Sequence, residues 1–114
     1  MDHRDWRTLD ATALDVEIGD ARRKLEDITQ RRVDGVSIPF GSYDRRVLRR
    51  LKRESWEIIY TADRGTTPSK SRVKPRETLD AGMQGVNVLS KFLASPPMHV
   101  RAGRVLSRLY KQLR

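Results

Sequence analysis

The clearest pattern in the chain is a stripe of apolar residues in its first quarter. They recur at steps of four, three, four and three: Leu14, Ile18, Ala21, Leu25 and Ile28. This spacing places them along one side of a helix. Asp10 precedes the stripe, and its carboxylate can cap the helix by accepting a hydrogen bond from a backbone N–H of the first turn. The pattern therefore predicts a helix from Asp10 to about Gln30.

The period changes in the next segment, Val36–Phe40, where every second residue is apolar. This alternation is the period of a strand. Pro39 has no N–H to donate to a sheet, which places it at a strand end, an edge or a bulge. Gly41 then allows the backbone to bend sharply. We predict a short strand that ends in a tight corner.

A helix and a second strand are expected after this corner. Ser42 is suited to cap a helix over residues 44–53, whose apolar positions are Val47, Leu48 and Leu51. Trp56–Thr61 is rich in β-branched and aromatic residues and ends in a turn at 63–65, so it reads as a strand. Helix, strand, helix and strand at this spacing predict an α/β fold with parallel pairing.

The remaining third of the chain is predicted to be a loop followed by two helices. Residues 66–78 contain two prolines and several hydroxyl side chains, typical of a loop or an irregular edge segment. Residues 79–94 have apolar residues at helical spacing, and Ser95-Pro96-Pro97 breaks the chain. Residues 98–114 then form a cleaner pattern, with one apolar face made of Ala102, Val105, Leu106, Leu109, Tyr110 and Leu113. A second face is basic and consists of Arg101, Arg104, Arg108 and Lys111.

The length of the chain limits the number of domains, and the distribution of charge indicates possible partners. The 114 residues suffice for one small domain, and the formal net charge is +9. Residues 1–65 hold 14 basic and 13 acidic residues, whereas residues 66–114 hold 10 and 2, so the positive charge belongs to the C-terminal part. The basic face of the last helix could contact nucleic-acid phosphates or an anionic membrane surface, although such a stripe is usually a solvated face.

Several classes of site are excluded by what the sequence lacks. It has no cysteine, and hence no disulfide framework, thiolate metal site or Cys nucleophile. Its two histidines, His3 and His99, are isolated, and no Gly-rich phosphate loop or nucleophile elbow is present. No apolar run is long enough for a membrane span, and no signal peptide is visible, so we expect a cytoplasmic location.

One motif is more specific than the rest, the block Pro39-Phe-Gly-Ser-Tyr-Asp44. It lies within a longer pattern that also comprises His3, Trp6, Leu9, Leu14, Glu17-Ile18, Ala21-Arg22, Leu25, Val47, Leu51, Tyr60-Thr61, Asp63 and Gly65. With this pattern, the run from His3 to about Thr78 resembles the latter part of a polysaccharide deacetylase domain (NodB homology, carbohydrate esterase family four). The resemblance says little about the last third of the chain.

The resemblance implies a fold, a reaction and a cofactor. Residues 1–78 would be the C-terminal part of a distorted (β/α) barrel, and residues 79–114 a basic helical extension. The family hydrolyses N-acetyl groups, or sometimes O-acetyl groups, of amino-sugar polymers, so the implied enzyme is a hydrolase of non-peptide carbon–nitrogen bonds. It uses a divalent metal, usually zinc, held by one Asp and two His.

The resemblance also implies roles for particular residues. His3 matches the second metal-binding histidine. The backbone N–H of Phe40, which follows Pro39, would help to hold the oxyanion. The residues expected on the substrate side are Gly41, Tyr43, Asp63 and Arg76.

The sequence departs from the family pattern at the catalytic centre. The early Asp-Asp motif, which supplies a metal ligand and the general base, is absent, and the first metal His would fall just before Met1. Ser37 stands where an Arg often precedes the proline. We therefore expect a truncated or inactive form that does not hydrolyse its substrate alone.

Two alternatives to a deacetylase remain open. One is a non-enzymatic basic module that binds nucleic acid or an anionic surface through residues 66–114. The other is an inactive carbohydrate-binding relative that binds chito-oligosaccharides without turnover. If the domain is truncated, two parallel strands without a closed barrel leave unpaired edges, from which we expect marginal stability and self-association.

Overall fold

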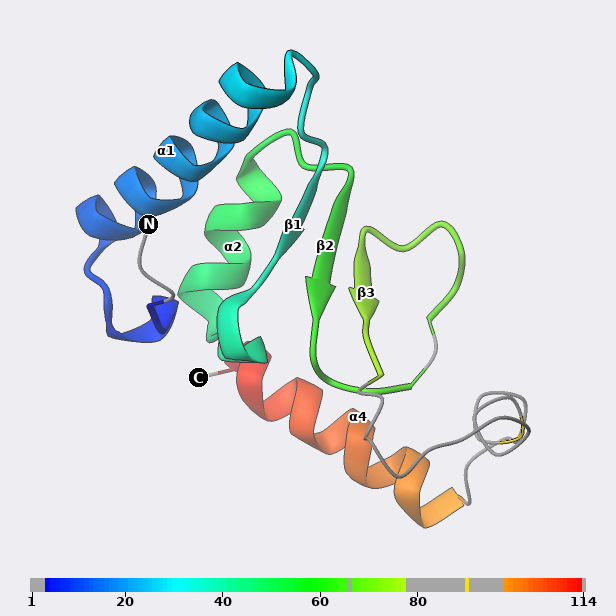
Figure 1. Ribbon diagram of the computed structural model, residues 1–114. Helices are drawn as coiled ribbons and strands as arrows, with labels where there is room; N and C mark the ends of the chain where they lie inside the picture. The colour runs from blue at the N-terminus through cyan, green and yellow to red at the C-terminus, as the bar shows by residue number, and fades with distance from the viewer. Residues whose placement is uncertain (1–3, 66, 78–89, 91–97, 114) are drawn as a thin grey trace.

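A parallel sheet of three short strands forms the centre of the fold in the computed structural model, which describes residues 4–65, 67–77, 90 and 98–113 (Figure 1). The strands are β1 (Gly35–Ser37), β2 (Ile58–Thr61) and β3 (Val73–Pro75), in that spatial order. β2 pairs in parallel with both neighbours. The chain is therefore an α/β protein, as its alternation of helix and strand predicted.

Two helices pack against the sheet and against each other. They are α1 (Ala11–Thr29) and α2 (Arg45–Arg53), and α2 forms the connection between β1 and β2. A one-turn helix, Trp6–Thr8, precedes α1. The core between these elements and β2 consists of Trp6, Leu9, Leu14, Ile18, Ile38, Tyr43, Val47, Leu48, Leu51, Trp56 and Ile59.

The predicted first helix is confirmed, including its cap. The Asp10 side chain accepts a hydrogen bond of 2.7 Å from the backbone N–H of Ala13. Only the first two residues of its apolar stripe, Leu14 and Ile18, are in the core, however, whereas Ile28 is 79% exposed. A 19-residue helix is about 28 Å long, and strands of three or four residues span about 10–13 Å. The sheet is therefore too short to cover the end of α1.

The corner after β1 differs from the prediction. The strand ends at Ser37, and Pro39–Gly41 forms a one-turn helix in place of the predicted strand end. Ser42 does not cap α2. Its backbone N–H donates to the carbonyl of Pro39 and so belongs to this turn, and its hydroxyl donates to Asp5 Oδ2 at 3.0 Å. The cap is Asp44, which accepts from the N–H of Val47 at 2.9 Å.

The third strand was not predicted, because it lies in the segment that reads as a loop or irregular edge. The N–H of Ile59 donates to the carbonyl of Arg72, and the N–H of Arg76 donates to that of Thr61, both at 2.7 Å. Pro75 is the last residue of β3, at the edge of the sheet, where a missing N–H is tolerated.

The last helix, α4 (Met98–Leu113), runs across the end of the sheet to which the strands point (Figure 1). An amphipathic helix usually packs with its apolar side inward, but α4 packs with its basic side toward the sheet. The large apolar side chains face solvent, with Leu106 65% and Tyr110 63% exposed. The predicted solvated basic face is wrong for Arg104, Arg108 and Lys111, which are half-buried against the sheet end.

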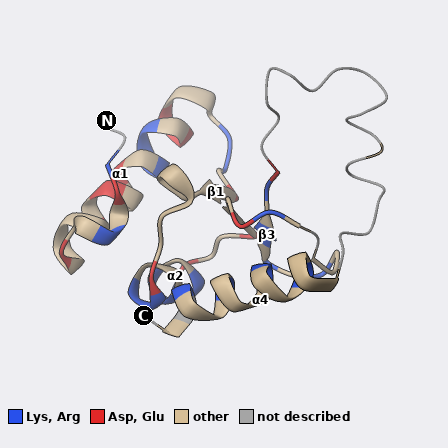
Figure 2. Ribbon diagram, turned by 90° about the horizontal axis from the view of Figure 1, so that it is seen from below, with Lys and Arg blue, Asp and Glu red and all other residues tan. Residues whose placement is uncertain are grey.

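Hydrogen-bond acceptors at the end of the sheet explain this orientation. Figure 2 shows α4 beside the strands, with its Lys and Arg positions in blue. Arg108 donates to the carbonyl of Arg64 at 2.6 Å, and Arg104 lies 3.6 Å from a carboxylate oxygen of Glu77. Cations satisfy these oxygens, whereas an apolar face would leave them without partners. The predicted helix over residues 79–94 and the break at residues 95–97 lie outside the described residues, except for Ser90.

Candidate functional site

The structure brings most of the predicted site residues to one edge of the sheet. The Pro39–Gly41 turn follows β1, Asp63 follows β2 and Arg76 follows β3. Because the strands are parallel, these positions share the carboxyl end of the sheet, where α/β proteins usually bind ligands. His3, the predicted metal ligand, lies outside the described residues.

The turn after β1 has an unusual backbone. Phe40 has φ 57° and ψ 2°, in the left-handed region, and its side chain is 68% exposed. This conformation costs a residue with a Cβ about 1–2 kcal/mol. Gly41 also has a positive φ of 62°. A Cβ at Gly41 would lie 2.3 Å from Cβ of Ala62, so the turn is pressed against the segment that leaves β2.

A buried polar group lies beside this turn. The Tyr43 ring is 2% exposed, and its hydroxyl donates a hydrogen bond to Oδ2 of Asp63. The Asp63 side chain is 3% exposed, and Lys111 of α4 donates to its other oxygen at 2.6 Å. Lys111 also lies 5.1 Å from the centre of the Tyr43 ring and 3.5 Å from the carbonyl oxygen of Gly41. One lysine thus joins α4 to both strand ends.

The protonation states of this group follow from its contacts. Burial alone would raise the pKa of Asp63, but the hydrogen bonds from Lys111 and Tyr43 outweigh it and the pKa is lowered. Burial, together with the hydrogen bond to Asp63, raises the pKa of Tyr43. At neutral pH the group therefore contains the Asp63 carboxylate and the neutral Tyr43 phenol, both of which contact Lys111.

These contacts limit what the edge can do chemically. Both Asp63 oxygens are engaged and its charge is balanced by Lys111. In residues 4–65, 67–77, 90 and 98–113, no three His, Cys, Asp or Glu side chains are grouped so that they could hold a metal ion. The part of the chain that the structure describes therefore leaves the predicted zinc untested, and it stays a prediction.

Arg76 occupies the outer end of the edge. Its side chain is exposed, and its backbone extends the pairing of β3 with β2. The next residue, Glu77, accepts a hydrogen bond of 2.7 Å from the N–H of Gly65 and pairs with Arg104. The roles of Tyr43, Asp63 and Arg76 in substrate binding also stay predictions.

Sequence reasoning missed two residues at this edge, Lys111 and Ala62. Lys111 belongs to a recognisable basic stripe, but its partner Asp63 is 48 residues earlier, and no local pattern joins the two. Ala62 is a small residue directly after a strand, and Gly41 has no Cβ. Two such residues allow two backbones to lie close together, as they do here. Both contacts arise because parallel strands end at the same edge of the sheet, and neither joins residues that are close in the sequence.

None of the described helices combines the length and the apolar character that crossing a membrane requires. The predicted cytoplasmic location stays a prediction. When the chain was compared with models of protein families, with curated proteins and with solved structures, no match was found.

Proposed function

We propose that this chain is a polysaccharide deacetylase-like module that binds acetylated amino-sugar chains at the carboxyl ends of β1 and β2. The proposal rests on the resemblance carried by residues 39–44 and on the placement of that block. The barrel implied by the resemblance is part of the proposal. The parallel pairing and the helical connection through α2 are compatible with a piece of such a barrel.

The observation that carries the proposal is the conformation of Phe40. A large aromatic residue is held in the left-handed region in the turn that follows β1, and the residue is 68% exposed. Strain of this kind persists where the surrounding structure enforces it, and it concentrates at ligand-binding sites. An exposed ring can pack against the apolar face of a sugar. The resemblance assigns to the backbone N–H of Phe40 a hydrogen bond to the acetyl oxygen.

The resemblance implies that hydrolysis requires groups that are not among these 114 residues. The resemblance calls for a general base in an Asp-Asp motif, which the sequence lacks. A divalent metal would polarise the acetyl carbonyl when bound, and His3 is the one ligand that the resemblance assigns to this chain. The proposed activity of the chain by itself is therefore binding of the acetylated polymer without turnover, while the deacetylase reaction belongs to a complete catalytic set.

The experiment is a comparison of two oligosaccharides that differ in one group. Binding of chitopentaose and of its fully deacetylated form is measured by titration calorimetry, with and without zinc, and acetate release is followed in parallel. We expect binding of the acetylated form alone and no acetate release. Equal binding of both forms, or binding of neither, would refute the proposal.

Two variants localise the binding. Phe40→Gly removes the ring, while glycine readily adopts the left-handed backbone conformation of this position. The variant should therefore bind the acetylated form more weakly, because the contact of the ring with the sugar is lost. Ile28→Ala is the matched control, because Ile28 is also exposed but lies at the far end of α1. If both variants bind equally well, the assignment of Phe40 is wrong.

A further inference from the structure

The outward side of α2 is strongly basic. Its nine residues, Arg45–Arg53, comprise six basic and three apolar side chains and no acid. The apolar ones are buried. Four basic side chains are exposed along the opposite side: Arg45, Arg49, Lys52 and Arg53. We call these four residues the α2 basic face.

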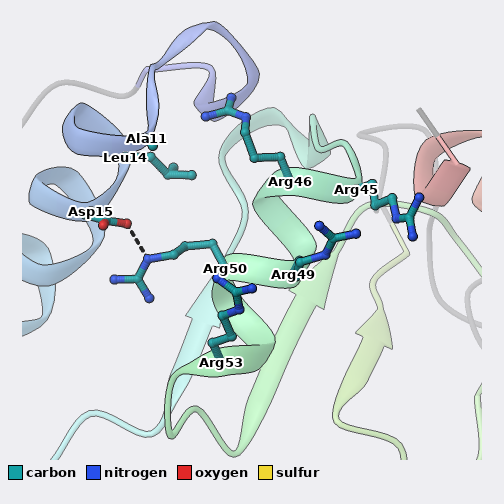
Figure 3. Close-up of a pocket in the computed structure, with 8 residues that line it drawn as sticks. All are labelled: Ala11, Leu14, Asp15, Arg45, Arg46, Arg49, Arg50 and Arg53. Atoms are coloured by element: carbon teal, nitrogen blue, oxygen red, sulfur yellow. Dashed lines mark hydrogen bonds and ion pairs between the residues drawn. The ribbon is translucent and has the colours of Figure 1, made fainter.

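The basic residues of α2 form two rows along the helix with different surroundings. In Figure 3, Arg46 and Arg50 extend toward the α1 side, whereas Arg45 and Arg49 extend to the other side. Arg46 and Arg50 are half-buried and anchored: Arg46 donates to the carbonyl of Arg7 at 3.2 Å, and Arg50 pairs with Asp15 and Glu54. These two arginines hold α2 to its neighbours. Their charges are therefore used within the fold.

The other row is different, because its charges are not balanced. Among residues 4–65, 67–77, 90 and 98–113, no carboxylate forms an ion pair with Arg45, Arg49 or Arg53. The three follow one another at steps of four, so each is the neighbour of a like charge on the helix surface, which is unfavourable. A bound anion would relieve this repulsion.

The row also borders a hollow in the surface. Between the start of α1 and α2 lies a groove of about 530 Å³, lined by five arginines and one acid, Asp15. In Figure 3, Arg50 reaches across to Asp15, while Arg49 and Arg53 stay on the α2 side. A ligand at this groove would meet guanidinium groups on one wall and a single, already paired carboxylate.

The spacing of the row suits a linear polyanion. Steps of four residues advance about 6 Å along a helix, so the three arginines span about 12 Å. A nucleic-acid strand carries one charge per about 3.4 Å of duplex axis, which is dense enough to offer each guanidinium a phosphate. Guanidinium groups bind phosphate oxygens through two parallel hydrogen bonds.

We propose that the α2 basic face binds the phosphodiester backbone of a nucleic acid, with Arg45, Arg49 and Arg53 each contacting a phosphate. Binding is independent of base sequence, because the contacts go to the backbone. This site is separate from the sugar site proposed above and from the basic stripe of α4, most of which contacts the sheet end.

The test is the salt dependence of binding to a short fluorescein-labelled DNA duplex, measured by anisotropy on the full chain. Three phosphate contacts contribute a slope of about −2.7 to log K against log salt, equal to about a 40-fold loss of affinity between roughly 50 and 200 mM salt. The variant R45Q/R49Q/R53Q should lose this part of the slope, and Arg49→Gln alone about a third of it. Circular dichroism checks that each variant is folded.

A variant matched in charge tests whether position matters. R31Q/K70Q/R101Q removes three exposed positive charges that are scattered over the surface. It should retain the wild-type slope within about one unit. Equal losses in the two triple variants would refute the proposal, since net charge would then explain binding. Equal competition by polyglutamate at the same charge concentration would also refute it, because phosphate would not be the recognised group.

Discussion

Replacing Gly41 by Ala tests the packing of the candidate site most directly. The added Cβ would lie 2.3 Å from Cβ of Ala62 and 3.1 and 3.2 Å from its backbone N and Cα. Two of these atoms belong to the backbone that leaves β2, so they cannot rotate away as the end of a side chain would. The backbone at Gly41 also has φ 62°, which disfavours any residue with a Cβ.

Two contributions set the size of the effect. The left-handed conformation costs Ala about 1–2 kcal/mol more than Gly. Forcing one methyl group into filled space typically costs about 1–3 kcal/mol. Gly41→Ala should therefore lower the free energy of unfolding by about 2–5 kcal/mol. A domain of 114 residues has a total of roughly 6–17 kcal/mol, so the loss is a large fraction of it.

The assay is urea unfolding followed by tryptophan fluorescence, with two matched variants. Gly103→Ala makes the same change in α4, where an added Cβ meets nothing within 4 Å, and it should stabilise by up to about 1 kcal/mol. Ala62→Gly combined with Gly41→Ala removes the closest contact and should recover about 1–2 kcal/mol. The reasoning fails if Gly41→Ala changes stability by less than about 0.5 kcal/mol.

Four further measurements test the site and α4. Lys111→Met should cost about 1–3 kcal/mol in urea unfolding, because the carboxylate of Asp63 stays buried without its cation and Lys111 itself is only 30% exposed. The pKa of Asp63 is lowered in the folded state, so ionised Asp63 stabilises the fold. This contribution is complete above the unfolded pKa of about 3.9 and is lost as the pH falls through the lower folded pKa. Asp63→Asn should therefore remove that part of the acid dependence of the free energy of unfolding. Phe40→Gly should raise the free energy of unfolding by about 1 kcal/mol, since the strained backbone is relieved, and an unchanged or lower free energy of unfolding would contradict the strain. Leu106→Gln and Leu109→Gln should each change stability by less than about 0.5 kcal/mol because both side chains face solvent, whereas losses of several kcal/mol would show that this face is covered.

Local patterns were sufficient for elements stabilised by their own residues. The helix after Asp10 was predicted from its apolar spacing and its cap, and both are observed. β2 and α2 were found for the same reason, with ends displaced by one or two residues. The cap of α2 was misplaced because Ser42 and Asp44 are both good caps, and only the turn at Pro39–Gly41 decides where the helix begins.

The candidate site was predictable in its location but not in its contacts. A proline and a glycine after a strand indicated the corner, and parallel strands bring such corners to one edge. The left-handed conformation of Phe40 was not predictable, since nothing in its local sequence requires it. Nor was the burial of Asp63 by Lys111, which joins residues 48 positions apart.

The sequence by itself determined the alternation of helices and strands, the cap at Asp10 and the amphipathic character of the last helix, because each depends on residues within a few positions of one another. The tertiary structure alone decided which face of α4 packs. The amphipathic pattern predicts the apolar face inward, but the sheet ends in carbonyl groups and two carboxylates, and these buried acceptors select the basic face. The same packing uses three positive charges of α4 within the fold, whereas Arg45, Arg49 and Arg53 of α2 stay exposed.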